Sequence, residues 1–399
     1  FNIINIFKFI KKLKILLNIL NYLKFIYKYL LITMSINVTN LQEKNNILTF
    51  TISNIDVCYA NSIRRIILSH IPCVVFKPSY EDNKLDIVKN TSRFNNEIIK
   101  QRLGCIPIFM NAFDNELNVD DYIVELDVTN TTNNIIYVTS KDFKIKNVKN
   151  DKYLSEDVMY KIFPPDTITG DYIDIIRLRP LLGEKTGESL KLIAKLGIDK
   201  AVNDGMYNVV STCSYGNTVD PIAADEEWKN REEKLKSYSK KEIEKMKKDF
   251  YALNAKRYFK KNSFDYIIET LGIYNNFEIV KYACSILIDK LLKFDDKFKS
   301  SENSIKESEI LSENSYDLIL ENEDYTIGKI IEYNLYKKYF DKEIITYIGF
   351  LKKHPHDKYS IIRVVFKDII KNEEIISFVS ESINDSVLLI NEIKDKFKE

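Results

Sequence analysis

The sequence lacks any CxxC pair, and its five cysteines are scattered through 399 residues. Zinc ribbons and disulfide frameworks need closely spaced or paired cysteines, so this spacing argues against both. Single cysteines in apolar surroundings are typical of the core of a reduced, intracellular protein. We therefore expect a protein that works inside the cell and needs no metal or other cofactor. The cysteines are Cys58, Cys73, Cys105, Cys213 and Cys284.

Histidine is also scarce, and only His354 and His356, with Asp357, form a cluster of the kind that holds a metal or a general base. Two histidines and one carboxylate leave a metal short of ligands, and His70, the third histidine, would have to converge from a distant part of the chain. One hypothesis is a metal-dependent enzyme, which predicts bound metal and loss of function on His356→Ala. The sequence offers no other constellation of catalytic groups, and this favours a non-enzymatic role.

Long apolar runs are missing as well. Around Leu17 the longest charge-free stretch is 15–23, far short of the ~20 apolar residues that a membrane span requires, so we expect no membrane segment. Before Thr33 the chain uses only Phe, Asn, Ile, Lys, Leu and Tyr, which can all be encoded by A and T alone, and the first methionine is Met34. We interpret 1–33 as translated upstream sequence from an AT-rich genome. A surface-lying amphipathic helix is the alternative.

The chain has no excess of positive charge. Residues 1–33 contain six lysines and no acidic residue, so from Met34 onward 53 basic residues face 58 acidic ones. Free-standing nucleic-acid binders normally show a strong basic excess. We therefore expect the protein to meet DNA only indirectly, within a larger complex. The 366 residues from Met34 are enough for two or three domains.

Two stretches far apart in the sequence share one pattern, which predicts an apolar strand, a polar turn and an Ile-rich helix in that order. They are 48–76 and 316–350, and in each a run of period two ends at an asparagine, Asn54 or Asn322. Neither stretch buries its apolar face alone. The pattern predicts an α+β fold in which two half-modules of antiparallel strands and helices form an intramolecular pseudo-dimer.

Composition predicts the boundaries between these parts. Residues 78–182 read as an inserted, strand-rich domain, and the charged segment 226–261 reads as a solvated helix with Trp228 as its packing anchor. Residues 299–315, rich in Ser, Glu, Lys and Asp, predict a flexible linker. The first half-module thus comprises 34–77 and 183–298, and the second comprises 316–399.

Apolar residues at helical spacing predict which side chains form the core between the half-modules. They are Ile63, Ile66, Ile67, Ile327, Ile330, Ile331, Leu287, Ile383 and Val387.

Several blocks resemble the assembly platform of multisubunit RNA polymerases. The first half-module resembles the archaeal D subunit, the third-largest subunit of eukaryotic RNA polymerase II and the bacterial alpha N-terminal domain, and the second resembles the archaeal L subunit and its eukaryotic counterpart. The first set of blocks is 61–68 (NSIRRIIL), 71–72 (IP), 102–108 (RLGCIPI) and 138–144 (VTSKDFK). The second set is 322–328 (NEDYTIG), 347–350 (YIGF), 354–355 (HP) and 361–365 (IIRVV).

The resemblance implies a non-catalytic platform in which the two halves, here fused, hold the largest and second-largest subunits and contact small polymerase subunits. It implies partner contacts through Arg64 and Arg65 on the helix of 61–70, and through Arg102 and Gly104. It also implies that His354 lies in a turn between strands. Fusion of the two subunits and an AT-rich coding sequence resemble what is found in large cytoplasmic DNA viruses. A viral origin would place the protein in the host cytoplasm or the virion, whereas a cellular polymerase would place it in the nucleus.

The chain departs from this family in lacking the cysteine clusters that bind zinc or iron–sulfur groups in some relatives. This departure predicts that the chain binds no metal.

A further hypothesis of a different class is a virus-specific structural interaction protein that keeps the dimerisation fold without a polymerase. It predicts self-association without contact to large subunits. The blocks that include Arg64, Arg65 and Arg102 favour the polymerase platform, because the fold alone does not require these arginines.

Overall fold

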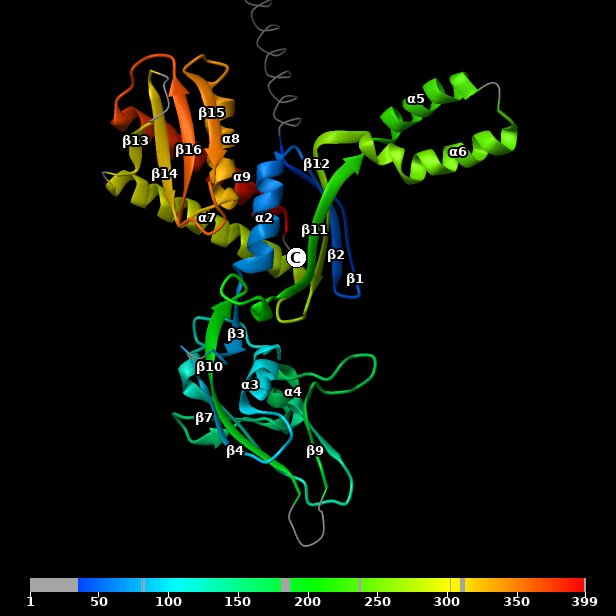
Figure 1. Ribbon diagram of the computed structural model, residues 1–399, viewed down its shortest axis with the longest axis vertical. Coiled ribbons are helices and arrows are strands. Elements are labelled where there is room, and N and C mark those ends of the chain that lie inside the picture. The colour runs from blue at the N-terminus through cyan, green and yellow to red at the C-terminus, as the bar shows by residue number, and fades with distance from the viewer. Residues whose placement is uncertain are drawn as a thin grey trace, which may run out of the picture. The chain divides into compact units, whose positions relative to one another are not determined.

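The computed structural model describes residues 35–79, 81, 83–180, 187–235, 238–301, 303–308 and 313–397 (Figure 1). The predicted upstream extension, 1–33, lies outside the described residues. Within the described ranges, no helix combines the length and the apolar character that crossing a bilayer requires.

Packing divides the chain into two compact units. One holds the described residues up to Gln42 together with Thr49–Ala60 and Tyr215–Tyr266, and the other holds Glu43–Leu48, Asn61–Ser214 and Ile267–Glu399 as far as it is described. Several strands and one helix run from one unit into the other. The elements are therefore described below by their order along the chain.

The first module is a four-stranded sheet with two helices, interrupted by an insertion. Its sheet has the order β1-β2-β12-β11. A tight turn joins the first two strands, and both of its residues, Asn45 and Asn46, have positive φ, as a two-residue hairpin turn requires. The elements are β1 (Asn37–Lys44), β2 (Ile47–Ser53), α2 (Val57–Ser69), β11 (Val210–Val219), β12 (Phe259–Thr270) and α7 (Asn276–Ser300).

The second module repeats this arrangement in one continuous stretch. Its sheet has the order β13-β14-β16-β15, which is the same as in the first module when strands are counted along the chain. All three strand pairs are antiparallel, so the predicted α+β class with antiparallel half-modules is confirmed. The elements are β13 (Ile305–Glu307), β14 (Ser315–Glu321), α8 (Tyr325–Tyr339), β15 (Ile345–Leu351), β16 (Tyr359–Phe366) and α9 (Asn372–Lys396).

The repeat extends to single residues at the strand-to-helix turns. Asn54 after β2 and Asn322 after β14 both adopt the left-handed conformation, with φ of 66° and 54°. Two residues later an aspartate carboxylate accepts a backbone N–H of the helix that follows: Asp56 from Cys58 in α2, and Asp324 from Thr326 in α8. Asparagine tolerates the left-handed turn and aspartate favours a helix start, so the same three-residue device opens both helices.

The predicted linker requires correction, because part of 299–315 is regular structure. Helix α7 continues to Ser300, and Ile305–Glu307 forms β13, which pairs with β14. The buried hydroxyl of Ser304 donates to the carbonyl of Phe298, 2.7 Å away, and so holds the start of the second module to the end of α7. The polar composition reflects an edge strand, which needs few apolar side chains because only one face of it packs.

The insertion between α2 and β11 is strand-rich, as its sequence predicts. Its main sheet has the order β3-β10-β5-β7-β8, with β4 also paired to β10 and a separate β6-β9 pair. Because β3 and β10 belong to this sheet, the insertion extends beyond 78–182 at both ends. Its elements are β3 (Pro72–Phe76), β4 (Leu85–Asn90), α3 (Asn96–Gly104), η1 (Val119–Asp121), β5 (Tyr122–Thr129), β6 (Ile136–Thr139), η2 (Ser140–Asp142), β7 (Lys144–Asn147), β8 (Lys152–Tyr153), α4 (Glu156–Ile162), β9 (Asp174–Leu178), β10 (Ser189–Lys200) and η3 (Gly205–Tyr207).

The charged segment 226–261 is not one helix. It lies in a pair of helices between β11 and β12, which we call the arm: α5 (Pro221–Glu232), η4 (Glu233–Leu235), α6 (Lys240–Ala252) and η5 (Asn254–Arg257). Trp228 is buried against Phe250 of α6, with ring centroids 5.5 Å apart, so its predicted role as a packing anchor is confirmed. The helical segment is interrupted after η4, because Ser239 and Glu242 form a capping box that starts a new helix, α6.

Eight of the nine predicted core residues are buried, each at most 3% exposed. Val387 on α9 is the exception and is only partly buried. The residues that are buried are Ile63, Ile66, Ile67, Ile327, Ile330, Ile331, Leu287 and Ile383.

We predict that Leu287→Ala lowers the free energy of unfolding by about 3 kcal/mol, because truncating a fully buried leucine leaves a cavity. Leu292→Ala on the same helix is the matched control, since Leu292 is 41% exposed, and we expect it to cost less than about 1 kcal/mol. Denaturant unfolding measures both. Equal losses in the two variants would contradict the assigned core.

Candidate functional site at the contact between the two modules

Helix α2 of the first module contacts the start of α8 in the second. The hydroxyl of Ser62 donates to the backbone carbonyl of Thr326, and both residues are 1% exposed. One turn further along α2, the Nε of Arg65 donates to the Thr326 hydroxyl at 2.9 Å, and its Nη2 forms an ion pair with Asp324. Residues 259 or more positions apart thus meet, which is the contact that an intramolecular pseudo-dimer requires.

Arg65 therefore has a partner within its own chain. The family resemblance implies a contact of Arg65 with a large partner subunit, whereas here its guanidinium bonds to the cap and the first turn of α8. Its position explains this, because Ile63, Ile66 and Ile67 form the buried face of α2 and Arg65 lies at the edge of that face. An arginine at the rim of an interface keeps its guanidinium partly in water while the same group donates hydrogen bonds to the other side of the interface.

A second ion pair and His70 lie beside this contact. Lys290 of α7 pairs with Glu323, the residue before the α8 cap, at 3.0 Å. The Nδ1 of His70 lies 2.7 Å from the Ser69 hydroxyl. Burial and the positive charges of Lys290 and Lys200 lower the pKa of His70 to about 4, against the opposite effect of Asp324.

The pKa values of the two carboxylates before α8 are shifted in opposite directions. Burial raises the pKa of Glu323 above its usual range despite the nearby charge of Lys290. Burial also acts to raise the pKa of Asp324, but the hydrogen bonds from Thr326 and the charge of Arg65 outweigh it, and the net shift is downward. Asp324 is thus the carboxylate that the contact holds in its charged form.

Hydrogen bonds between the long helices add polar contacts that the apolar pattern did not reveal. The Ser380 hydroxyl of α9 donates to Asp295 of α7 at 2.6 Å. The side-chain amide of Asn334 on α8 donates to the Ser386 hydroxyl of α9, also at 2.6 Å, and Ser386 is completely buried. Serines at the helical spacing of the apolar stripe are the sequence signal that could have predicted these contacts. Small hydroxyl residues let two helices approach closely and still provide a hydrogen-bond partner for a buried amide.

Arg64 lies one residue from Arg65 and has a different environment. Its Nε and Nη2 donate to the side-chain oxygen of Asn61 on the same helix, at 3.2 and 2.9 Å. Within the described ranges it forms no ion pair, and its side chain is half-buried. Of the two neighbouring arginines, Arg64 is the one whose charge has no acidic partner among the residues that the structure describes.

Arg102 and Gly104 have local roles in the insertion. The guanidinium of Arg102 donates to the backbone carbonyls of Ile175 and Asp174, at 2.8 and 2.7 Å, and so ties α3 to β9. Gly104 is the last residue of α3, and a Cβ at this position would lie 2.5 Å from the sulfur of Met206. Both residues therefore shape the surface around 102–108, and the structure does not bring them together with Arg64 or Arg65.

His354 and His356 lie in the exposed turn between β15 and β16. The backbone N–H of His354 donates to the Asp357 carboxylate at 3.0 Å, and that of His356 donates to Nδ1 of His354 at 3.2 Å. Local turn bonding thus involves the side chains of His354 and Asp357 and the backbone of His356. In the described part of the chain, no group of three or more His, Cys, Asp or Glu side chains is arranged to hold a metal ion.

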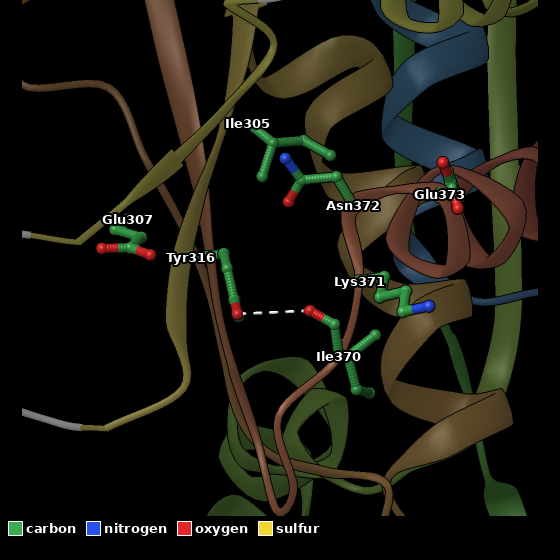
Figure 2. A pocket seen from close by; sticks show the side chains of 7 residues that line it. All are labelled: Ile305, Glu307, Tyr316, Ile370, Lys371, Asn372 and Glu373. Carbon is green, nitrogen blue, oxygen red and sulfur yellow. Dashed lines mark hydrogen bonds between the residues drawn. The ribbon is translucent and has the colours of Figure 1, made fainter.

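A hollow on the second module, shown in Figure 2, lies between β13, β14 and the start of α9. The Tyr316 hydroxyl that faces it donates to the carbonyl of Ile370 at 3.3 Å, so this group is already bonded. The charged groups at its rim are Glu307, Lys371 and Glu373. These residues include no nucleophile paired with a base, so the hollow offers no catalytic arrangement.

A comparison with protein families matches residues 49–291 to the model described as the RNA polymerase Rpb3/Rpb11 dimerisation domain. The matched residues run from within β2 to within α7, and so cover most of the first module, without β1 and the end of α7, together with the insertion and the arm. No curated protein sequence matches the chain.

We predict that a double-mutant cycle of Arg65→Ala and Asp324→Asn gives a coupling energy of about 0.5–1 kcal/mol in denaturant unfolding. Asparagine keeps the cap on α8 while removing the charge, and side chains that are 34% and 35% exposed are partly screened by water. The exposed pair Lys367–Glu343 is the control, with coupling near zero. A coupling no larger than that of the control would show that the ion pair does not stabilise the contact.

We predict that acidification destabilises the protein through His70. The unfolded chain binds a proton at this histidine below about pH 6.5, whereas the folded protein does so only near pH 4, so stability falls as pH falls between these values. His70→Gln removes the titration, and its free energy of unfolding should fall less steeply over the same window. Unfolding at several pH values measures this slope, and identical slopes would refute the assignment.

Proposed function

Because the chain belongs to the RNA polymerase Rpb3/Rpb11 dimerisation domain family, we propose that it is the assembly platform of a multisubunit DNA-dependent RNA polymerase with both dimerisation partners fused. The family supports a role in the dimerisation and assembly of RNA polymerase subunits. Such a platform is non-catalytic by itself. In this proposal it docks the two large catalytic subunits and contacts small ones.

The presence of the second module is the observation that supports the proposed fusion of two dimerisation partners. The family match ends at residue 291, yet 305–396 repeat the strand order of the matched module, its left-handed asparagine and its aspartate cap. Both modules also end in a helix of 25 residues, α7 and α9. In this proposal, the first module is the D-like partner and the second is the L-like partner.

The contacts between α2 and α8, and between α7 and α9, support an obligate pairing. Interfaces of this kind are core-like, and here the buried isoleucines of α2 and α8 carry that character. Tethering holds both halves at an effective concentration in the millimolar range, so fusion fixes their stoichiometry. We assign the elements of the first module to the D-like half, those from β3 to η3 to the insertion, and those from β13 to α9 to the L-like half. These bounds replace the predicted ones, which are 34–77 with 183–298, 78–182 and 316–399.

Arg64 is our choice for the contact with a large subunit. It is half-buried on the helix that carries the module contact, and its guanidinium has no acidic partner in the described chain. A carboxylate on an incoming subunit would pair with its planar fork. Arg102 and Gly104 take a positioning role in this proposal, because their own interactions hold the 102–108 surface in shape. The complex would act inside the cell, in the host cytoplasm if it is viral.

We predict that Arg64→Ala reduces copurification of the large polymerase subunits at least tenfold while leaving the free energy of unfolding within about 0.5 kcal/mol. Arg65→Ala should lower stability as well, because it removes the bonds to α8. Arg93→Ala, at an exposed arginine of the insertion, is the control and should change neither quantity.

Affinity purification from the native source with mass spectrometry measures these outcomes. Recovery of the unaltered chain without any large subunit would overturn the polymerase assignment and leave a self-associating structural protein. Normal recovery with Arg64→Ala would overturn only the role of this arginine.

A further inference from the structure

The arm is an addition to the sheet from which it extends, because the second module has the same strand order without one. It occupies the connection between β11 and β12, which runs from 220 to 258 in the first module. The corresponding connection of the second module, between β15 and β16, runs only from 352 to 358. A sheet with the same strand order therefore forms with a short connection. The additional residues of the arm are expected to have a role other than forming the sheet.

The arm is built as an ordered helical pair. Ala224, Trp228, Phe250 and Ala255 form a small core of its own, and Figure 1 shows α5 and α6 running alongside each other. Asp220 caps α5 by accepting the N–H groups of Ile222 and Ala223. An ordered scaffold of this kind can present surface side chains in a fixed pattern.

Charge is segregated within the arm and the strand that follows it. Residues 240–261 contain nine basic side chains and only three acidic ones. The acidic residues are concentrated on α5, where two of them already have partners: Glu227 pairs with Arg231, and Asp225 accepts the hydroxyl of Tyr251. The near-neutral charge of the whole chain therefore conceals a strongly basic segment.

Three lysines form a stripe on the outer side of α6. Ile243, Met246 and Phe250 face the arm core, and Lys241, Lys245 and Lys248 lie on the opposite side, all exposed. Like charges three and four residues apart destabilise a helix. In the described chain the only ion pair among residues 240–261 joins Lys248 to Glu244 at 3.4 Å, so most of this repulsion is uncompensated.

We propose that the arm binds the phosphate backbone of duplex nucleic acid, without reading its sequence, through the stripe of Lys241, Lys245 and Lys248. The stripe is about 10 Å long at 1.5 Å per residue, and a duplex presents about one negative charge per 1.7 Å of its axis, so about six phosphates lie within its reach.

Lysine rather than arginine supplies eight of the nine basic residues in 240–261. Lysine acts as a point charge on a flexible stem, which suits phosphates in varying positions, whereas the planar fork of arginine suits bidentate recognition in fixed geometry, as at a base edge. This composition favours contact with phosphates over readout of bases. The inference goes beyond the proposed function, and the isolated chain suffices to test it.

The experiment measures fluorescence anisotropy of a labelled 20-base-pair duplex of arbitrary sequence with the full chain, between 50 and 200 mM salt (about the range over which phosphate contacts weaken). The variant is Lys241→Gln, Lys245→Gln and Lys248→Gln combined, since glutamine keeps the helix propensity. The control removes three exposed lysines elsewhere, with Lys89→Gln, Lys353→Gln and Lys358→Gln. Trp228, the single tryptophan, reports by its fluorescence whether the arm stays folded.

We expect the stripe variant to bind at least tenfold more weakly at low salt, and the slope of log affinity against log salt to fall by about 2.7, or 0.9 for each lost contact. The control should retain both values, and the Trp228 emission should be unchanged in both variants. Equal affinities of variant and control, with the arm folded, overturn the proposal. Stripe-dependent binding of a polyglutamate peptide without binding of the duplex would instead assign the arm to an acidic protein.

Discussion

The structure depends on the covering of helix faces that a single module leaves exposed. A small sheet with two helices buries little apolar surface by itself, and in this chain the buried isoleucines of α2 and α8 and the buried stripes of α7 and α9 lie where helices of the two modules meet. Burial of this kind is strong but not directional. The apolar faces therefore explain why the modules associate, but not the register in which they do so.

The register comes from the polar groups at the edges of those faces. Ser62 meets a backbone carbonyl at the first turn of α8, Arg65 reaches the cap of the same helix, and Asn334 meets a serine of α9 within the core. Each of these groups would lose a partner if the helices slipped by one turn, and a buried polar group without a partner costs about 1–3 kcal/mol. Association and alignment thus have separate physical causes in this protein.

The sequence predicted those features that repeat at a regular period. The strand and helix plan of both modules, the buried isoleucines and the packing of Trp228 follow from local pattern, and the structure agrees with them. It did not predict β13, because an edge strand of three residues carries no periodic signal, nor the break between α5 and α6, because the same charge pattern fits one helix or two. Arg65 shows a further limit. A sequence places an arginine beside an apolar face, but only the fold shows that an aspartate 259 positions later meets it there.

The short passage from α7 to β13 restricts what the two modules can do in a crowded solution. Ser304 is bonded back to Phe298, and Ser301 to Lys297, so the described residues on both sides of 302 are held to the end of α7. A module released from its own partner would have to break these bonds before pairing with another copy. The passage thereby opposes domain swapping, and it keeps each polypeptide closed on itself even when many are being synthesised together.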